Sequence, residues 1–85
     1  MNEILQEVIE FIDDLETDTS IPKNVKLKLI NLNKELKKTN ENNLSLTINK
    51  MLSDLDDISS DVNLDSFTRQ QIWGISSMLE SIDLN

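Results

Sequence analysis

The spacing of the apolar residues is the feature that most restricts the fold of this sequence. In the first stretch they recur every three or four positions, as Leu5, Val8 and Ile12 show. This spacing places side chains on one face of a helix, whereas strands alternate every second residue. Three more stretches repeat the pattern, and polar segments that favour turns separate them. The sequence therefore predicts an all-α fold with helices over residues 2–16, 22–38, 44–59 and 65–82.

The composition sets limits on the class of protein. The chain has 85 residues with one Gly and one Pro, so it predicts a single helical domain over 1–85 and few tight turns. Its net charge of −8 disfavours nucleic-acid binding, because phosphates repel an acidic surface. No segment has the roughly 18 apolar residues that a membrane span needs. The lack of Cys excludes disulfides and fits a cytoplasmic location.

The two halves of the chain align at an offset of 43 residues without a gap. Two unrelated amphipathic hairpins would also align apolar with apolar residues. A shared Asp-Asp pair, followed four residues later by another Asp, favours a true repeat. The aligned pairs include Asp14 with Asp57, Asp18 with Asp61, Lys26 with Arg69, Ile12 with Leu55 and Leu36 with Leu79.

We therefore predict two copies of one helical hairpin, over residues 2–38 and 44–82. A period of this length with two helices per unit is the size of a HEAT-type repeat. The hairpins are HEAT-like only, because the spacing between the turn Asp and the basic residue departs from that family. Two units are too few for an open solenoid, so we expect them to close into a four-helix bundle or to pair with a second chain.

Residue types that carry catalysis are scarce. The chain has no His, Cys or Tyr, so we predict no enzyme, no catalytic residue and no cofactor. The best metal candidate is Asp61-x-Asn63-x-Asp65, which matches the first half of a calcium loop. Such a loop also needs Gly at its sixth position and Glu at its twelfth, where this chain has Ser66 and Ile72. We therefore predict no metal site.

Acidic residues gather at the ends of the first and third predicted helices, where they oppose the helix dipole by about 0.3–1 kcal/mol each. Unfavourable placements of this kind occur at functional sites. One interpretation is that basic residues of the following helices offset the charge. The other is that the acidic residues, including Asp13 and Asp56, bind something. The repeated turn positions to examine are Asp14, Asp18, Lys26, Asp57, Asp61 and Arg69.

The last predicted helix has an unusual face. Its core stripe is predicted to consist of Phe67, Ile72, Ile75, Met78, Leu79 and Ile82. Trp73 lies about 180° from Leu64 and Ile82 on a helical wheel, and therefore off this stripe. Small residues flank it, and a mid-helix Gly is often kept where another backbone comes close. We predict that the other hairpin or a second chain buries Trp73. The candidate interaction surface is Leu27, Ile30, Trp73, Gly74, Ser77 and Ser81.

Three motifs resemble a known family. They are Ile21-Pro22-Lys23-Asn24-Val25-Lys26, Asp57-Ile58-Ser59-Ser60-Asp61-Val62-Asn63 and Thr68-Arg69-Gln70-Gln71-Ile72-Trp73. These motifs and the chain length are similar to the archaeal uncharacterised protein family 0147, over nearly the whole sequence. The resemblance implies a compact helical protein of the archaeal cytoplasm and implies no activity. Asp65 departs from the family, which tends to have proline near the start of the last helix.

These observations favour a non-catalytic function. We predict a protein-interaction or assembly module that presents helical faces to a protein partner, or to a second copy of itself in a homodimer. The alternative is an acidic surface that binds cations or basic partners through the repeated Asp clusters. Neither nucleic acid nor a membrane is expected as a partner, and no residue identifies the protein partner.

Overall fold

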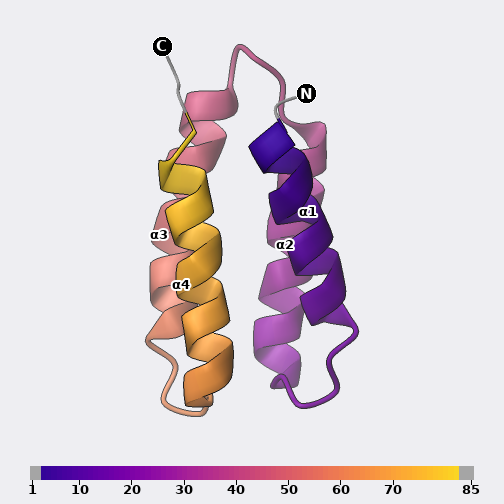
Figure 1. Cartoon of the computed structure of the whole chain (residues 1–85), viewed down its shortest axis with the longest axis vertical. Helices are drawn as coiled ribbons and strands as arrows, with labels where there is room; N and C mark the ends of the chain where they lie inside the picture. The colour runs from indigo at the N-terminus through magenta and orange to yellow at the C-terminus, as the bar shows by residue number, and fades with distance from the viewer. Residues whose placement is uncertain (1–2, 83–85) are drawn as a thin grey trace.

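The computed structural model describes residues 3–82, in which every regular element is a helix. α1 packs along α2 and α3 along α4, so each half of the chain is a helical hairpin (Figure 1). The predicted helices are confirmed to within two residues, with the largest difference at the end of α4. The bounds are Glu3–Glu16 for α1, Lys23–Lys38 for α2, Leu44–Ser59 for α3 and Ser66–Glu80 for α4.

The two hairpins pack against each other around one apolar core. α1 also packs against α4, and α2 against α3, whereas in the diagonal pairs α1–α3 and α2–α4 no Cα atoms lie within 8 Å of each other. Each helix runs antiparallel to both of its neighbours (Figure 1). The molecule measures 36 × 20 × 17 Å along its principal axes. Each helix therefore buries one stripe and exposes the opposite face, as the spacing of its apolar residues predicts.

The buried positions of the two hairpins correspond at the 43-residue offset. Leu29 and Ile72 are both fully buried, as are Leu36 and Leu79. Thr68 is also buried, at the position that corresponds to Val25. The buried pairs are Leu5 with Ile48, Val8 with Met51, Ile12 with Leu55, Leu15 with Ile58, Ile21 with Leu64, Val25 with Thr68, Leu29 with Ile72, Leu32 with Ile75 and Leu36 with Leu79.

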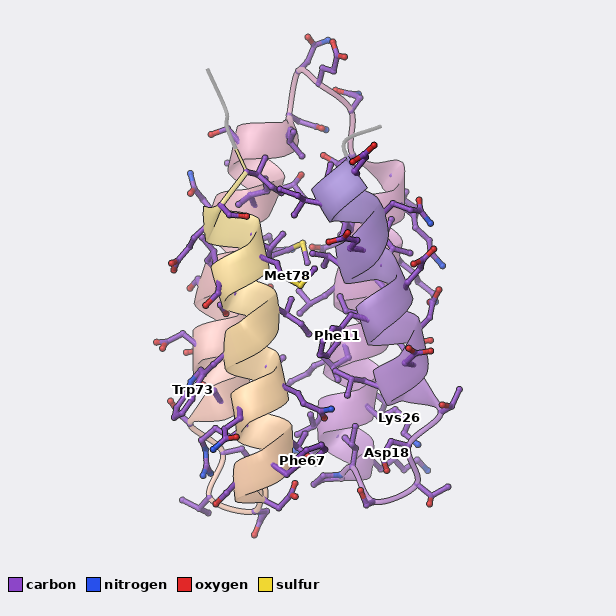
Figure 2. All side chains as sticks on the ribbon, in the orientation of Figure 1. Phe11, Asp18, Lys26, Phe67, Trp73 and Met78 are labelled. Carbon is purple, nitrogen blue, oxygen red and sulfur yellow. The ribbon has the colours of Figure 1, made fainter. Side chains whose placement is uncertain are left out.

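The prediction that Phe67 belongs to the core stripe is wrong. Its side chain is 63% exposed, and Thr68 occupies the inward position of the first turn of α4. The reason is helical spacing, because Thr68 lies four residues before Ile72 and therefore one turn away from it on the same face. Phe67 is rotated by about 100° from Thr68 around the helix. It lies at the lower end of α4, on the side of the α1–α2 hairpin (Figure 2).

The second and fourth helices begin in the same way although their preceding residues differ. Pro22 has φ −54° and ψ 142°, and Asp65 has φ −72° and ψ 160°, so both are extended. The Pro22 carbonyl accepts the N–H of Lys26 at 2.9 Å, and the Asp65 carbonyl accepts that of Arg69 at 3.0 Å. Asp65 thus takes the conformation that the proline ring fixes in Pro22, which explains why the helix start survives the change.

The loop between the hairpins is held by asparagine side chains. Asn40 Oδ1 accepts the N–H groups of Asn42 and Asn43 at 2.9 and 3.2 Å. Asn43 Oδ1 accepts the N–H of Asn40 and the hydroxyl of Thr39, each at 2.8 Å. Short amide side chains compete for backbone partners in this way, and so favour turns over helix.

Candidate functional site

The turn between α1 and α2 and the turn between α3 and α4 have equivalent hydrogen bonds. Asp18 Oδ1 accepts the N–H of Ser20, and Asp61 Oδ1 accepts the N–H of Asn63, each at 2.9 Å. Asp18 and Asp61, which the 43-residue offset pairs, therefore occupy equivalent places and bond nearby backbone N–H groups. Backbone bonds from residue 17 to 14, 18 to 15 and 21 to 18 recur 43 positions later.

Both turn aspartates have a pKa below the ordinary value. For Asp18, bonds from the hydroxyl and N–H of Ser20 lower the pKa, and the charge of Lys26 adds a smaller effect. For Asp61, the N–H of Asn63 has the largest effect on the pKa, followed by the Asn24 amide, whose Nδ2 donates to Oδ2 at 3.2 Å. Hydrogen bonds to a carboxylate favour its charged form. The Asn24 bond also links the two hairpins at their turn ends.

The basic residues that follow the two turns do not act alike. Arg69 donates from Nε to the Ser59 carbonyl at 2.8 Å, and from Nη2 to the carbonyls of Asp61 and Leu64, both at 3.0 Å. Its guanidinium therefore ties the end of α3 to the turn and to the start of α4. Lys26 holds the equivalent position, but within residues 3–82 it donates no side-chain hydrogen bond. Its contribution is the weak attraction to Asp18.

The acidic end of α1 is partly neutralised by α2. Asp13 Oδ1 accepts a hydrogen bond from Asn33 Nδ2 at 2.6 Å and lies 3.6 Å from Lys37 Nζ. This contact agrees with the interpretation that a basic residue of the following helix offsets the charge, and Lys37 lies in the last turn of that helix. Asn33 is only 2% exposed and was not predicted to be buried. Asp14 and Asp57 themselves have exposed side chains.

Trp73 is 54% exposed, so the prediction that the other hairpin buries it is wrong, whereas burial by a second chain stays a prediction. It lies on the outer side of the α3–α4 hairpin, away from the contact between hairpins (Figure 2). A hollow beside it is lined by Leu52 and Asp56 of α3 and by Trp73, Ser76, Ser77 and Glu80 of α4. We call these six residues the Trp73 face. The two serines are too small to cover the indole, which explains its exposure.

Only part of the predicted interaction surface joins Trp73 in one patch. Leu27 is 54% exposed and Ile30 is half-buried, but both lie on α2, which does not pack against α4. Ser77 lines the hollow, whereas Ser81 follows α4 and donates its hydroxyl to the Met78 carbonyl at 2.7 Å. A Cβ atom built on Gly74 would meet no atom within 4 Å, so this chain makes no close approach there.

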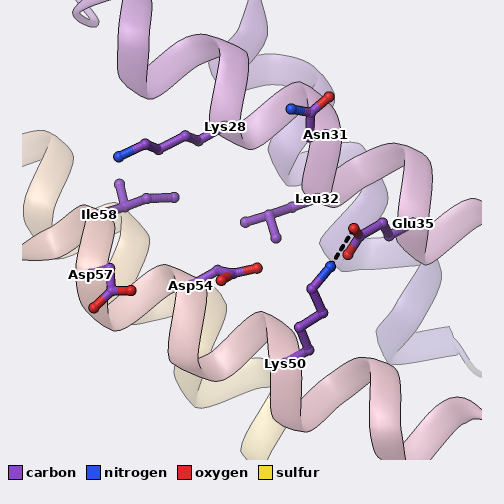
Figure 3. A pocket seen from close by; sticks show the side chains of 8 residues that line it. All are labelled: Lys28, Asn31, Leu32, Glu35, Lys50, Asp54, Asp57 and Ile58. Atoms are coloured by element: carbon purple, nitrogen blue, oxygen red, sulfur yellow. Dashed lines mark hydrogen bonds and ion pairs between the residues drawn. The ribbon is translucent and has the colours of Figure 1, made fainter.

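A second hollow, with more charged side chains in its lining, lies between α2 and α3 (Figure 3). Lys50 donates to Glu35 at 2.5 Å across it, and this bond raises the pKa of Lys50. Lys28, Asp54 and Asp57 also line the hollow, above the buried side chains of Leu32 and Ile58. Basic and acidic side chains both surround this opening, and exposed ion pairs of this kind contribute little stability. We therefore interpret it as a solvated seam between the hairpins.

The described residues were examined for a metal site and for a membrane-spanning helix. Over 3–82, no group of three or more acidic side chains is arranged to hold a metal ion. No helix in this range is long and apolar enough to cross a membrane. Asp61, the first residue of the partial calcium motif, uses Oδ1 to bind the N–H of Asn63.

The fold and the Trp73 face define an all-α protein of two packed helical hairpins, with an exposed hollow beside Trp73. The family model for the uncharacterised protein family UPF0147 matches residues 1–82. The chain belongs to this family, which confirms the resemblance seen in its three motifs.

Relatives in several archaea agree with this assignment. The chain is 36% identical to a UPF0147 protein of Archaeoglobus fulgidus over 94% of its own length and 90% of the relative. It is 31% identical to a UPF0147 protein of Methanosarcina acetivorans, covering 98% and 84% of the two chains. For a UPF0147 protein of Methanocaldococcus jannaschii the identity is 32%, with coverage of 94% and 85%. No solved structure matches the chain significantly.

Proposed function

We propose that this protein is a non-catalytic interaction module that binds a protein partner through the Trp73 face. The observation that carries the proposal is the half-exposed indole of Trp73 in a hollow between α3 and α4. Trp is enriched at interfaces because it combines a large apolar ring with an N–H donor. Residues that dominate binding energy are most often Trp, Tyr and Arg placed in hollows that exclude water.

The surroundings of Trp73 support a docking role. Leu52 is only partly buried and supplies an apolar floor, while Ser76 and Ser77 leave room for an incoming side chain. Asp56 and Glu80 form a charged edge, and polar edges around an apolar centre are typical of interfaces. Gly74 has free space at its Cβ position, so a partner can approach the helix closely there. A partner protein or a second copy of the chain would then cover the indole.

We also propose that the hairpins are two copies of one HEAT-like repeat, closed into a four-helix bundle. Three observations support this origin. α1 and α3 end 43 residues apart, and so do the starts of α2 and α4. The backbone bonds of the two turns correspond at this offset. A superposition of the hairpins in an experimental structure tests the proposal, since it should place Ile12 on Leu55 and Leu36 on Leu79, and a better fit at another offset would refute it.

The alternative function, cation binding by the acidic clusters, has less support. Asp13 already has Asn33 and Lys37 as partners, and the Asp18 and Asp61 carboxylates bind backbone N–H groups. A calcium titration followed by thermal melting tests this alternative. A calcium concentration of 100 times the dissociation constant would add about 2.7 kcal/mol to the free energy of unfolding. An unchanged melting temperature would refute the alternative.

The experiment for the main proposal is a matched pull-down from archaeal lysate. Trp73→Ser removes the indole, and Phe67→Ser removes another exposed aromatic of α4, about 120° away around the helix. We expect the wild type and Phe67→Ser to recover the same partner, and Trp73→Ser to lose it while its circular dichroism spectrum is unchanged. Equal recovery by all three proteins would show that the Trp73 face is not the binding site. Sedimentation of each purified protein shows whether the partner is a second copy.

A further inference from the structure

The Trp73 face has a counterpart in the first hairpin, and the two are filled differently. At the 43-residue offset Asp56 corresponds to Asp13, Ser76 to Asn33 and Glu80 to Lys37. Trp73 and Leu52 correspond to Ile30 and Ile9 in the same way. The seam between α1 and α2 can therefore be compared with the Trp73 face position by position, to see which side chains fill the same place in each hairpin.

In the first hairpin, two side chains of α2 occupy the seam. Asn33 Nδ2 donates to Asp13 Oδ1 at 2.6 Å, and Lys37 Nζ lies 3.6 Å from the same oxygen. An amide and an ammonium group of α2 thus face the same carboxylate oxygen. The acidic residue of α1 has its cationic partner within the same chain.

In the second hairpin, both of these donors are missing. Ser76 directs its hydroxyl to the Ile72 carbonyl of its own helix at 3.4 Å. Glu80 replaces the lysine, so two carboxylates line the hollow in place of an ion pair. Within residues 3–82 no side chain forms a hydrogen bond or ion pair with the carboxylate of Asp56 or of Glu80. The second hairpin therefore has two carboxylates without such partners beside a hollow, where the first hairpin has an ion pair.

We infer that the Trp73 face binds a lysine or arginine side chain from a basic segment of a partner protein. The inference rests on the proposed function and names the chemistry of the partner. The cation takes the place that Lys37 holds in the first hairpin, between the carboxylates of Asp56 and Glu80. Its methylene groups lie along Leu52 and the indole of Trp73, which also attracts a cation above its ring. Charge complementarity selects a basic partner over an apolar or acidic one.

The fluorescence of Trp73 offers a direct assay, because the chain has one Trp and no Tyr. The probe is a short helical peptide with lysines on one face, and its comparison is the same peptide with acetylated lysines. We expect the lysine peptide to shift the Trp73 emission and to bind more weakly as salt increases. The acetylated peptide should leave the emission unchanged. Equal binding of both peptides would overturn the inference in favour of simple apolar docking, and binding of neither would overturn it as well.

A variant that imitates the first hairpin tests the inference without a ligand. Ser76→Asn with Glu80→Lys gives the second seam the donors of Asn33 and Lys37. We expect it to fill its own hollow, shift the Trp73 emission in the absence of peptide, and weaken peptide binding about tenfold or more. Glu10→Lys on the exposed surface of α1 makes the same change in net charge and should bind as the wild type does.

The outcomes separate this inference from the proposed function. If the double variant still recovers the lysate partner while Trp73→Ser loses it, the face is an interaction site but the basic occupant is wrong. If Glu10→Lys weakens peptide binding as much as the double variant, the attraction is one of net charge and the inference fails. Dimers of the wild type that dissociate in Trp73→Ser, with no response to the lysine peptide, would replace the basic segment by a second copy.

Discussion

Replacing Arg69 with Met should destabilise the protein far more than the same change at Lys26. Arg69→Met keeps an apolar side chain of similar reach but removes three hydrogen bonds, to the carbonyls of Ser59, Asp61 and Leu64. A single bond contributes about 0.5–1.5 kcal/mol net, and bonds to charged groups contribute more. Because Arg69 is only partly buried, we take about 1 kcal/mol for each bond, or about 3 kcal/mol in total.

Lys26→Met is the matched control, since Lys26 occupies the equivalent place in the first hairpin. Among the described residues Lys26 weakly attracts Asp18, and an exposed pair of this kind adds little stability. For a domain of this size, 1 kcal/mol corresponds to a shift of about 4–8 °C in Tm. We therefore expect Arg69→Met to lower Tm by about 12–24 °C and Lys26→Met to lower it much less.

Urea unfolding followed by circular dichroism measures both free energies on the same scale. Arg69→Lys adds a third point, because a lysine keeps the charge but lacks the planar fork that reaches several carbonyls. It should recover less than half of the loss. Equal destabilisation by Arg69→Met and Lys26→Met would refute the claim that the guanidinium ties α3 to α4, and full recovery by Arg69→Lys would show that charge alone matters.

Three further outcomes follow from the structure. Gly74→Ala should raise the free energy of unfolding by about 0.5–1 kcal/mol in urea titrations, because Gly is a poor helix former and a Cβ meets no atom there; a loss of stability would point to an approach that this chain does not show. Trp73→Ala should cost clearly less than Ile72→Ala, for which about 2–5 kcal/mol is expected, since Trp73 is half-exposed and Ile72 fully buried; equal losses in thermal melts would mean that the indole is covered. Because the pKa of Asp61 is lowered in the folded state, its stabilising effect is present above about pH 4 and is lost as the pH falls through the folded pKa; Asp61→Asn should flatten the acid limb of the stability curve, and unchanged curvature would contradict this.

Much of the fold could be predicted because helical spacing and polar breaks are local signals. Ile72, Ile75 and Leu79 of the stripe predicted for the last helix are buried, and the turn aspartates that the offset pairs make equivalent backbone bonds. The 43-residue offset also predicted which residues would correspond in the two turns. These features depend on residues close in sequence, so one chain suffices to show them.

The errors concern contacts between helices. The other hairpin was predicted as one of two possible covers of Trp73, but the wheel position that takes Trp73 off the core stripe also takes it away from that hairpin. The buried bond of Asn33 to Asp13 depends on how α1 and α2 are rotated against each other, which spacing does not fix. The contrast between this seam and the Trp73 face also depends on contacts between helices.

A photo-crosslinking measurement tests the interaction claim most directly. A photoreactive amino acid at position 77 lies in the Trp73 face, and one at position 10 lies on the exposed surface of α1. After illumination in archaeal lysate, position 77 should give one discrete adduct that disappears when Trp73 is changed to Ser, while position 10 should give none. An adduct from position 10 alone, or one from position 77 that persists in Trp73→Ser, would contradict the claim that this face is where the protein binds its partner.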